Sequence, residues 1–264
     1  MIDCKSIAEK RKQELKEYIQ KNNLEVVLAV IQVGNDPASN SYVKGQQNDC
    51  KEIGIELMRY HYPEDTTTEE VITLIKQLNA TQIVNGIIVK LPLPKHLDKD
   101  KILNAIDDKK DVDGFKSTSK FTPCTAKGVK MILDSIGVDV DGKICCVIGR
   151  GEVGKSVVDV LTKHNATVIW CNSHTNTAWT NTFVDTSDII ISATGKSGLI
   201  NYVRDQIVID VGISRKEDGK LYGDVDKTCY RDDAMITPVP NGVGLMTRVA
   251  LLEHTVYASN NTKL

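Results

Sequence analysis

Short apolar runs alternate along this chain with segments in which apolar residues recur at helical spacing. The run Val26–Val33 is apolar on both faces, as in the buried strands of parallel sheets. Regular alternation of such runs with helical patterns is typical of α/β architecture. The predicted strands are 26–33, 55–60, 85–90, 143–148, 166–171, 188–192 and 207–211, and the predicted helices are 6–21, 37–54, 67–80, 125–136, 154–164 and 243–258.

Local stop signals agree with this division of the chain. Asp36-Pro37 suits a helix N-cap followed by proline at the first helical position, and Gly54 suits a C-cap. Leu91-Pro92-Leu93-Pro94 ends a strand, because a strand cannot continue through those prolines. A turn-rich, charged stretch from Asp107 to Thr122 separates two series of elements. We therefore expect two α/β lobes with a hinge near 115–122 and a small-molecule site in the cleft between them.

Composition narrows the class of protein. The 264 residues include 33 Lys and Arg and 35 Asp and Glu, a formal net charge of −2 that argues against nucleic acid as the partner. We find neither a secretory signal nor an apolar stretch long enough to span a membrane, so no membrane association is expected. The seven cysteines form no CxxC pair, which favours reduced thiols in the cytoplasm and no metal site.

The segment Gly149-Arg150-Gly151-Glu152-Val153-Gly154 has the GxGxxG pattern between a predicted strand and a predicted helix. The first glycine permits the tight turn, the second lets the backbone approach a pyrophosphate, and the third lets the helix pack closely on the strand. The N-terminal N–H groups of that helix would face the phosphates. This context predicts a dinucleotide site.

The next strand indicates which dinucleotide binds. An NAD-binding fold usually places Asp or Glu at the end of that strand, on the ribose 2′-OH. Here the strand ends in Asn172-Ser173-His174-Thr175, which offers no carboxylate to repel a 2′-phosphate. Arg150, Ser173 and His174 can all donate hydrogen bonds to such a phosphate. The sequence favours NADP and leaves NAD as an open alternative.

Candidate chemistry in the first lobe lies after its predicted strands. Tyr42 and Gln46 share one face of a helix, whereas Lys44 points elsewhere. Lys90 ends an apolar strand, where it could reach the same cleft, and Asp113 lies in a turn of the hinge stretch. Each residue alone also fits a purely structural role: a packed tyrosine, a solvated lysine, a turn-forming acid.

Together these segments resemble the bifunctional methylenetetrahydrofolate dehydrogenase/methenyltetrahydrofolate cyclohydrolase family, over nearly the whole chain. Several such blocks in order are far more specific than a shared Rossmann fold. The blocks are 36–39 with Tyr42-Val43, 86–94, 110–115, 122–125, 208–213, 223–225 and 237–244.

The resemblance implies a tetrahydrofolate-binding lobe, residues 1–117 with the returning C-terminal helix 242–264, and a Rossmann NADP-binding lobe, residues 118–241. It implies oxidation of 5,10-methylenetetrahydrofolate with NADP, hydrolysis of the methenyl product to 10-formyltetrahydrofolate, and a homodimer. Tyr42 would stack along the folate, and Asp113 would hold the pterin nitrogens by charge-assisted hydrogen bonds. Further implied contacts are Lys90, Leu91, Pro92, Pro238, Pro240 and Gly242 for the folate, and Thr194, Gly195 and Ile213 for the dinucleotide.

The chain departs from the family at the centre of the expected site. The family pattern Tyr-x-x-x-Lys carries the central catalytic lysine, but residue 46 is Gln; the family glutamine before Leu-Pro-Leu-Pro is Lys90. We infer that Lys90 supplies the missing charge from the strand instead of the helix; the alternative is a solvated Lys90 in a crippled protein. Because hydrolysis needs a positioned acid/base and hydride transfer needs mainly alignment, we expect the dehydrogenase activity to survive better than the cyclohydrolase activity.

Three smaller departures concern the edges of the site. The glycine loop is one residue shorter than the family's, His174 replaces an arginine, and Leu245 replaces a proline. The first two weaken the case for NADP, and the third loosens the loop expected beside the folate. The alternatives are a monofunctional dehydrogenase, a folate- or nucleotide-binding protein without catalysis, and a two-lobe dehydrogenase of another substrate.

Overall fold

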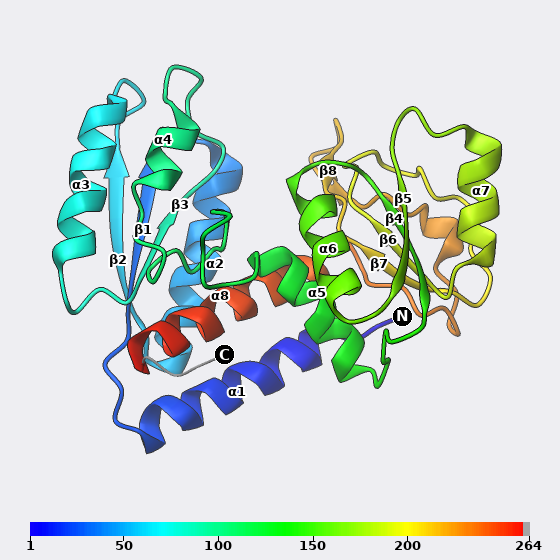
Figure 1. Ribbon diagram of the computed structural model, residues 1–264, viewed down its shortest axis with the longest axis horizontal. Coiled ribbons are helices and arrows are strands. Elements are labelled where there is room, and N and C mark those ends of the chain that lie inside the picture. Colours follow the sequence, from blue (N-terminus) through cyan, green and yellow to red (C-terminus); the bar gives the residue numbers. More distant parts are fainter. Residues whose placement is uncertain (261–264) are drawn as a thin grey trace. The chain divides into compact units, whose positions relative to one another are not determined.

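The computed structural model of this chain describes residues 1–260 and contains two parallel sheets with helices packed on them (Figure 1). The expected α/β class is confirmed. Residues 261–264 of the expected helix 242–264 lie outside the described residues. The helices are α1 Cys4–Lys21, α2 Pro37–Ile53, α3 Thr68–Ala80, α4 Lys99–Asn104, α5 Cys124–Ser135, α6 Glu152–Lys163, α7 Thr177–Thr186 and α8 Val243–Asn260, with a 3₁₀ turn at Lys227–Cys229.

The strands fall into three groups. One sheet has the order β2-β1-β3, and a second has the order β5-β4-β6-β7, with all neighbours parallel. A short antiparallel hairpin, β8-β9, follows the second sheet. The strands are β1 Val27–Val33, β2 Glu56–Tyr62, β3 Gly86–Val89, β4 Ile144–Ile148, β5 Thr167–Cys171, β6 Ile189–Ser192, β7 Ile207–Asp210, β8 Ser214–Arg215 and β9 Leu221–Tyr222.

The chain divides into two compact units, one around each parallel sheet. The β1–β3 unit comprises Lys10–Cys124 and the chain from Arg248 onward, and the β4–β7 unit comprises Met1–Glu9 and Thr125–Thr247. The expected limits were residues 117/118 and 241/242. The first residues cluster with the β4–β7 unit because the amide of Ile2 donates to the carbonyl of Ile236 at 2.9 Å.

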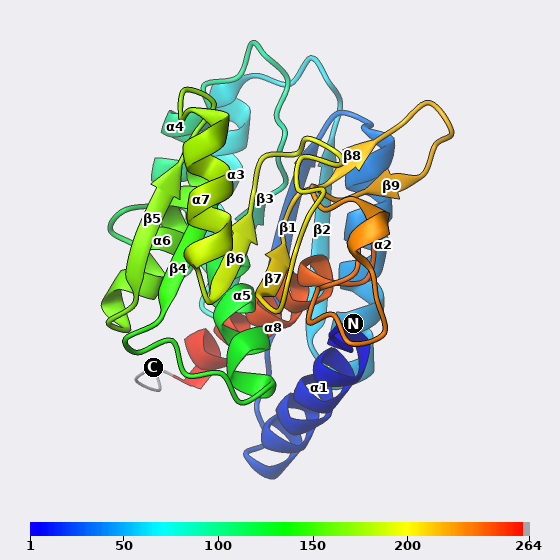
Figure 2. The same ribbon diagram turned by 90° about the vertical axis from the view of Figure 1, so that its right-hand side faces the viewer.

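In the β1–β3 unit the alternating faces of β1 are both covered (Figures 1 and 2). Val27, Ala29, Ile31 and Val33 pack against α3, while Gln32 on the other face donates to Asn40 of α2. Capping fixes the helix positions, because Asp36 caps α2 and a Thr67–Glu70 capping box starts α3. The carboxyl ends of β1 and β3 thereby lie beside the start of α2.

In the β4–β7 unit β4 is central and fully buried after its first residue. Cys146 and Ile148 of β4 pack with Ile190 of β6, Val208 of β7 and Val184 of α7. The hydrophobic burial of these aliphatic side chains stabilises the sheet and fixes the loops at its carboxyl edge. Those loops carry the GxGxxG segment, Thr194 and Ile213.

Candidate functional site

Lys90 directly follows β3, and its side chain lies over an aromatic ring. Its backbone amide still donates to the carbonyl of Ile31 on β1, at 2.8 Å. The Nζ atom lies 4.4 Å from the ring centroid of Tyr42 on α2, which is cation–π geometry. Both side chains are half-buried. The amine therefore faces the tyrosine rather than bulk solvent.

Two carboxylates act on this amine. Burial lowers the pKa of Lys90 below its ordinary value, while Asp113 and Asp36 act in the opposite direction. Burial also raises the pKa of Asp113 to about 6, Asp111 adds to this, and Lys90 opposes it. The same dehydrated environment thus brings the pKa values of the amine and the Asp113 carboxyl group closer together.

The turn that carries Asp113 is held by hydrogen bonds. The buried Asp111 carboxylate accepts from the amides of Gly114 and Lys116 at 3.2 and 3.0 Å. Gly114 has φ +76°, and a Cβ there would lie 2.7 Å from the carbonyl oxygen of Phe121. The Asp113 carbonyl accepts from the amide of Cys124 at 3.1 Å. The backbone on both sides of Asp113 is therefore fixed.

Tyr42 remains a neutral phenol in this environment. Burial, and then the Asp113 charge, raise the pKa of its hydroxyl above the ordinary value. The side chain can offer a ring face and a hydrogen-bond donor, but not a phenolate. That matches a binding surface better than a base.

Gln46 lies one turn after Tyr42 and is 2% exposed. Its Oε1 atom is buried and has no hydrogen-bond partner among the described residues. Such an acceptor costs about 1–3 kcal/mol unless a ligand or water satisfies it. Lys44 between them is exposed, as the helical spacing predicts.

Helix α8 braces the same face of α2, on which Asp49 follows Gln46 by one turn. Arg248 Nε lies 2.8 Å from Asp49 Oδ2, and Lys12 Nζ lies 3.4 Å from Asp49 Oδ1. Gly45 makes this approach possible, because a Cβ at residue 45 would collide with the Arg248 guanidinium. The residues of α8 after Thr247 thus belong to the β1–β3 unit.

The glycine loop of the β4–β7 unit meets the steric requirements of a dinucleotide site. Gly149 has φ +120°, and a Cβ there would lie 2.9 Å from the carbonyl carbon of Ala193. A Cβ at Gly154 would lie 2.9 Å from the carbonyl carbon of Gly149, so only glycine lets α6 approach β4 this closely. Gly151, the N-cap of α6, faces open space. These residues fit a pyrophosphate at the helix N-terminus.

The end of β5 presents donors without a carboxylate. The Oδ1 atom of Asn172 accepts from the amide of His174 at 2.7 Å, which orders the turn. Ser173 and His174 are exposed. The Arg150 guanidinium lies 4.4 Å from the ring of Trp170 on β5, an arrangement that the sequence did not reveal.

Two buried aspartates fix the other loops of this edge. Asp224 Oδ2 accepts from Ser192 Oγ, Thr194 N and Thr194 Oγ1 at 2.7, 2.7 and 2.9 Å. Asp210 accepts from the amides of Gly212, Asp224 and Val225. Gly195 and Ile213 follow these anchors and are exposed. No sequence motif marks these aspartates as loop anchors; the one local signal is the pair Gly212 and Gly223, where a Cβ would collide with the carboxyl groups of Asp224 and Asp210.

The remaining predicted folate contacts are spread over both units. Leu91 and Pro92 follow Lys90 in the β1–β3 unit, whereas Pro238, Pro240 and Gly242 belong to the β4–β7 unit. Gly242 is buried against the Pro238 carbonyl. Contact of all five with a folate stays a prediction.

Sequence reasoning also missed a buried histidine behind Asp113. His254 Nδ1 lies 2.8 Å from the carbonyl oxygen of Val112, and the Cys124 thiol donates to the same oxygen at 3.2 Å. The His254 ring packs against Phe121 at 4.8 Å. His254 and Cys124 therefore both hold the Val112 carbonyl, directly before Asp113. Because His254 lies far from this turn in the sequence, no local pattern reveals the contact.

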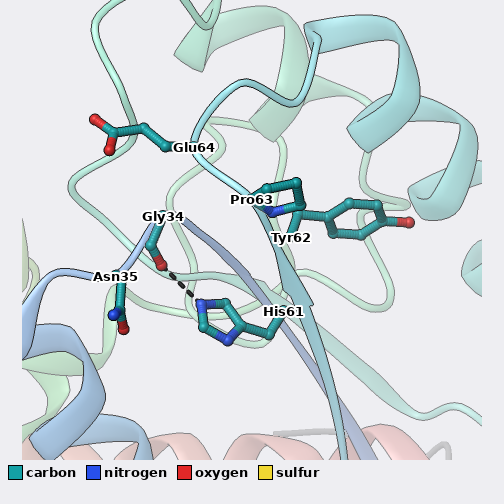
Figure 3. A pocket seen from close by; sticks show the side chains of 6 residues that line it. All are labelled: Gly34, Asn35, His61, Tyr62, Pro63 and Glu64. Carbon is teal, nitrogen blue, oxygen red and sulfur yellow. Dashed lines mark hydrogen bonds between the residues drawn. The ribbon is translucent and has the colours of Figure 1, made fainter.

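A shallow depression of about 260 Å³ lies at the ends of β1 and β2 (Figure 3). It is lined by Gly34, Asn35, His61, Tyr62, Pro63 and Glu64. The His61 ring is hydrogen-bonded to the Gly34 carbonyl at 2.8 Å. None of the predicted site residues lines this depression.

Among residues 1–260, no helix is long and apolar enough to cross a membrane.

Known proteins resemble the chain over nearly its whole length. The family model for the tetrahydrofolate dehydrogenase/cyclohydrolase catalytic domain matches residues 2–113, and the model for the NAD(P)-binding domain of the same family matches residues 123–263. Bifunctional protein FolD of Agathobacter rectalis is 45% identical over 275 residues, covering 98% of each chain. The FolD protein of Acetivibrio thermocellus is 43% identical, covering 98% of this chain and 96% of its own.

Solved structures agree with these matches. The crystal structure of the bifunctional FolD enzyme from Campylobacter jejuni superposes with a TM-score of 0.93 at 40% identity, covering 98% of each chain. The Trypanosoma brucei enzyme, complexed with NADP and an inhibitor, superposes with a TM-score of 0.92 at 30% identity, covering 99% of this chain and 97% of its own.

Proposed function

Because the chain belongs to the tetrahydrofolate dehydrogenase/cyclohydrolase family, we propose that its Tyr42, Lys90 and Asp113 cluster binds the folate and serves both reactions. The enzyme oxidises 5,10-methylenetetrahydrofolate to 5,10-methenyltetrahydrofolate with NADP and hydrolyses that product to 10-formyltetrahydrofolate. The bifunctional relatives do not favour the monofunctional and non-catalytic alternatives.

Asp113 and Tyr42 would bind and orient the folate. An ionised Asp113 accepts N–H bonds from the pterin amino group and ring nitrogen, a charge-assisted pairing. The Tyr42 ring offers an apolar face beside Lys90. The fixed backbone around Asp113 limits its freedom, which supports precise placement of the one-carbon bridge.

Lys90 would act as the acid/base of the hydrolysis. Water adds to the methenyl carbon and loses a proton to the Lys90 amine. Burial lowers the pKa of Lys90, so a larger fraction of this amine is neutral and able to accept a proton than in an ordinary lysine. The resulting ammonium returns a proton to N5 as the N5–carbon bond breaks, leaving the formyl group on N10. The hydroxyl proton of the water adduct leaves to solvent as the formyl C=O forms, so the overall step consumes one water and releases one proton. Gln46 would accept a hydrogen bond through its unpartnered Oε1.

The dinucleotide would lie along the glycine loop. Its pyrophosphate would face Gly151 and the first amides of α6, and Arg150, Ser173 and His174 would hold the 2′-phosphate. When bound, NADP supplies the hydride acceptor for the oxidation. Asp210 and Asp224 would hold the loops of Thr194, Gly195 and Ile213 in place for this binding.

The observation that carries this proposal is the Lys90 amine 4.4 Å from the Tyr42 ring centroid. Lys90→Gln tests it, with Lys44→Gln, an exposed lysine of α2, as the matched control. Methenyltetrahydrofolate absorbance follows its formation with NADP⁺ and its decay by hydrolysis. We expect Lys90→Gln to lose roughly a hundredfold of hydrolysis and less of oxidation, and the control to lose neither. Unchanged rates of both reactions in Lys90→Gln would refute the role.

We further propose that the enzyme is a cytoplasmic homodimer. All seven cysteines are buried and none forms a disulfide, which suits a reducing compartment. Leu199 and Tyr202 of the β4–β7 unit are large and exposed, which suits a protein interface. Light scattering on the purified enzyme measures the assembly, and the mass of a single chain would contradict the dimer.

A further inference from the structure

One aromatic side chain of β5 contacts the glycine loop in two ways. The indole Nε1 of Trp170 donates to the carbonyl of Gly149 at 2.8 Å. The ring face of Trp170 carries the Arg150 guanidinium, whose carbon lies 4.4 Å from the ring centroid. Trp170 therefore holds both the residue that precedes Arg150 and the charged group of Arg150 itself.

This double contact matters because Arg150 is otherwise exposed. A free arginine on a loop samples many rotamers, and binding must restrict them at an entropic cost. A guanidinium resting on an indole is already restricted, since cation–π attraction and stacking favour one region of space. The same Nε1 atom lies 3.7 Å from where a Cβ of residue 154 would be, so one edge of the indole approaches both Gly149 and Gly154 of the loop.

The location of the pair matches the part of the dinucleotide that distinguishes NADP from NAD. Trp170 lies two residues before Asn172, at the end of the strand beside which the adenosine ribose binds in such folds. Residues 172–175 contain no acid, and Arg150 is the only basic residue of the segment 149–154. A pre-positioned Arg150 would therefore supply the main charge available to a 2′-phosphate from the loop.

We propose that Trp170 is a specificity-determining positioning residue, which holds Arg150 for the 2′-phosphate and so favours NADP over NAD. It acts through Arg150 and contacts no reacting atom. The inference rests on the proposed dinucleotide site and extends it to a residue with no donor to the phosphate of its own. It predicts that Trp170 affects ligands that carry a 2′-phosphate far more than ligands that lack one.

Calorimetric titration of the whole enzyme tests this without turnover. The probes are NADP⁺ against NAD⁺ and adenosine 2′,5′-bisphosphate against ADP. We expect Trp170→Leu to weaken binding of the two ligands that carry a 2′-phosphate, NADP⁺ and adenosine 2′,5′-bisphosphate, about five- to tenfold. Binding of NAD⁺ and ADP should weaken less than twofold. Trp170→Phe, which keeps a ring face but loses the bond to Gly149, should retain most of the discrimination.

A double-mutant cycle separates positioning from a general structural role. Arg150→Ala should remove the discrimination, and Trp170→Leu added to Arg150→Ala should change it no further. Additive losses in the double variant, or equal weakening of NADP⁺ and NAD⁺ by Trp170→Leu, would overturn the inference. A wild-type enzyme that binds neither dinucleotide would instead refute the proposed function, so the two failures are distinct.

Fluorescence supplies a second readout. The chain has two tryptophans, and Trp179→Phe leaves Trp170 alone. Arg150→Ala in that background should change the Trp170 emission, because the guanidinium leaves the ring face. Adenosine 2′,5′-bisphosphate should change it in the presence of Arg150 and not in its absence. An emission that ignores both changes would contradict the contact.

Discussion

At the scale of single residues, the Lys90–Asp113 relationship determines how the candidate site can work. Burial alone would neutralise both groups, and their mutual attraction opposes that tendency. A pair held near this balance can change its charge when a ligand removes more water. Under the proposed function, the exchange of Lys and Gln between residues 46 and 90 moves one charge from the helix to the strand, and it can be reversed experimentally.

The double exchange Gln46→Lys with Lys90→Gln restores the family arrangement. We expect it to recover hydrolysis relative to Lys90→Gln alone, by about tenfold or more, because a positioned amine again faces the folate. Gln46→Lys alone should be the worst variant, since it adds a second ammonium on the face of α2 that carries Tyr42, over whose ring Lys90 lies. Initial rates of methenyltetrahydrofolate decay measure all three. A double variant no faster than Lys90→Gln would mean that the anchors are not interchangeable.

Because the proposed function places Asp113 on the pterin, folate binding should depend on pH. Its pKa is raised to about 6, so the carboxylate that accepts pterin N–H bonds predominates above that pH and the neutral acid below it. We expect the dissociation constant for 5-formyltetrahydrofolate to rise about tenfold per unit as pH falls below 6. Asp113→Asn should bind more weakly at neutral pH and lack this slope. Fluorescence titrations between pH 5 and 8 measure both, and a slope retained in Asp113→Asn would assign it to another group.

The candidate residues differ in how much of their role the sequence could provide. Tyr42 and Lys90 come after predicted strands, so a place at the carboxyl edge of one sheet was predictable for them, whereas Asp113 was expected only in a turn of the hinge stretch. The contact of Arg150 with Trp170 and the bond of Cys124 to the Val112 carbonyl join residues through tertiary packing. No local period encodes such contacts, and they became visible only in the structure.

At the scale of elements, strands and long helices were predictable because burial on one or both faces imposes a period. The prediction overlooked α4, the β8-β9 hairpin and α7. Residues 177–186 are rich in threonine, a poor helix former, and Val184 is the single buried residue of α7. A cap at Asn176 and packing against the sheet, rather than amphipathic spacing, hold that helix.

The glycine loop offers a matched pair of substitutions at this scale. Gly154→Ala forces a Cβ against the Gly149 backbone, so we expect the free energy of unfolding to fall by about 1–3 kcal/mol. NADP⁺ binding should weaken as well. Gly151→Ala meets open space at φ −73°, so stability should change by less than about 0.5 kcal/mol. The same substitution should still weaken NADP⁺ binding, because its methyl group would face the pyrophosphate.

Urea unfolding and calorimetric titration of the two variants provide the measurement. The steric argument requires stability and binding to fall together in Gly154→Ala and to separate in Gly151→Ala. If Gly151→Ala bound NADP⁺ as tightly as the wild type, the pyrophosphate would not approach residue 151.

At the scale of the whole molecule, the two-lobe α/β plan followed from the sequence because each lobe has its own alternation of strands and helices. The unit boundaries depend on long-range contacts. The hydrogen bond of Ile2 to Ile236 joins the first residues to the β4–β7 unit, although α1 continues into the β1–β3 unit. The ion pair of Arg248 with Asp49 joins the end of α8 to the β1–β3 unit, although the residues before it belong to the other unit. Each unit nevertheless has its own hydrophobic core. The effect of protonating a group in one unit can therefore be measured as a change in the stability of that unit.

The Asp210–Asp224 pair should make the β4–β7 unit less stable as pH rises. Burial, and then the Asp224 charge acting against three backbone bonds, raise the pKa of Asp210 to about 6, above its unfolded value. The folded state therefore holds more protons than the unfolded state between pH 4 and 6. The stability that this proton contributes is present below pH 4 and is lost as pH rises through 6. Asp224→Asn removes the repulsion, so its stability relative to wild type should improve across that window.

Tryptophan fluorescence during urea unfolding reports this unit, since Trp170 and Trp179 both belong to it. We expect the difference in unfolding free energy between Asp224→Asn and wild type to shift by about 1 kcal/mol or more in favour of the variant from pH 4.5 to 7. Asp232→Asn, an exposed aspartate of the same unit, is the matched control and should show no such trend. A difference that stays constant with pH would mean that the charge of Asp224 does not raise the pKa of Asp210.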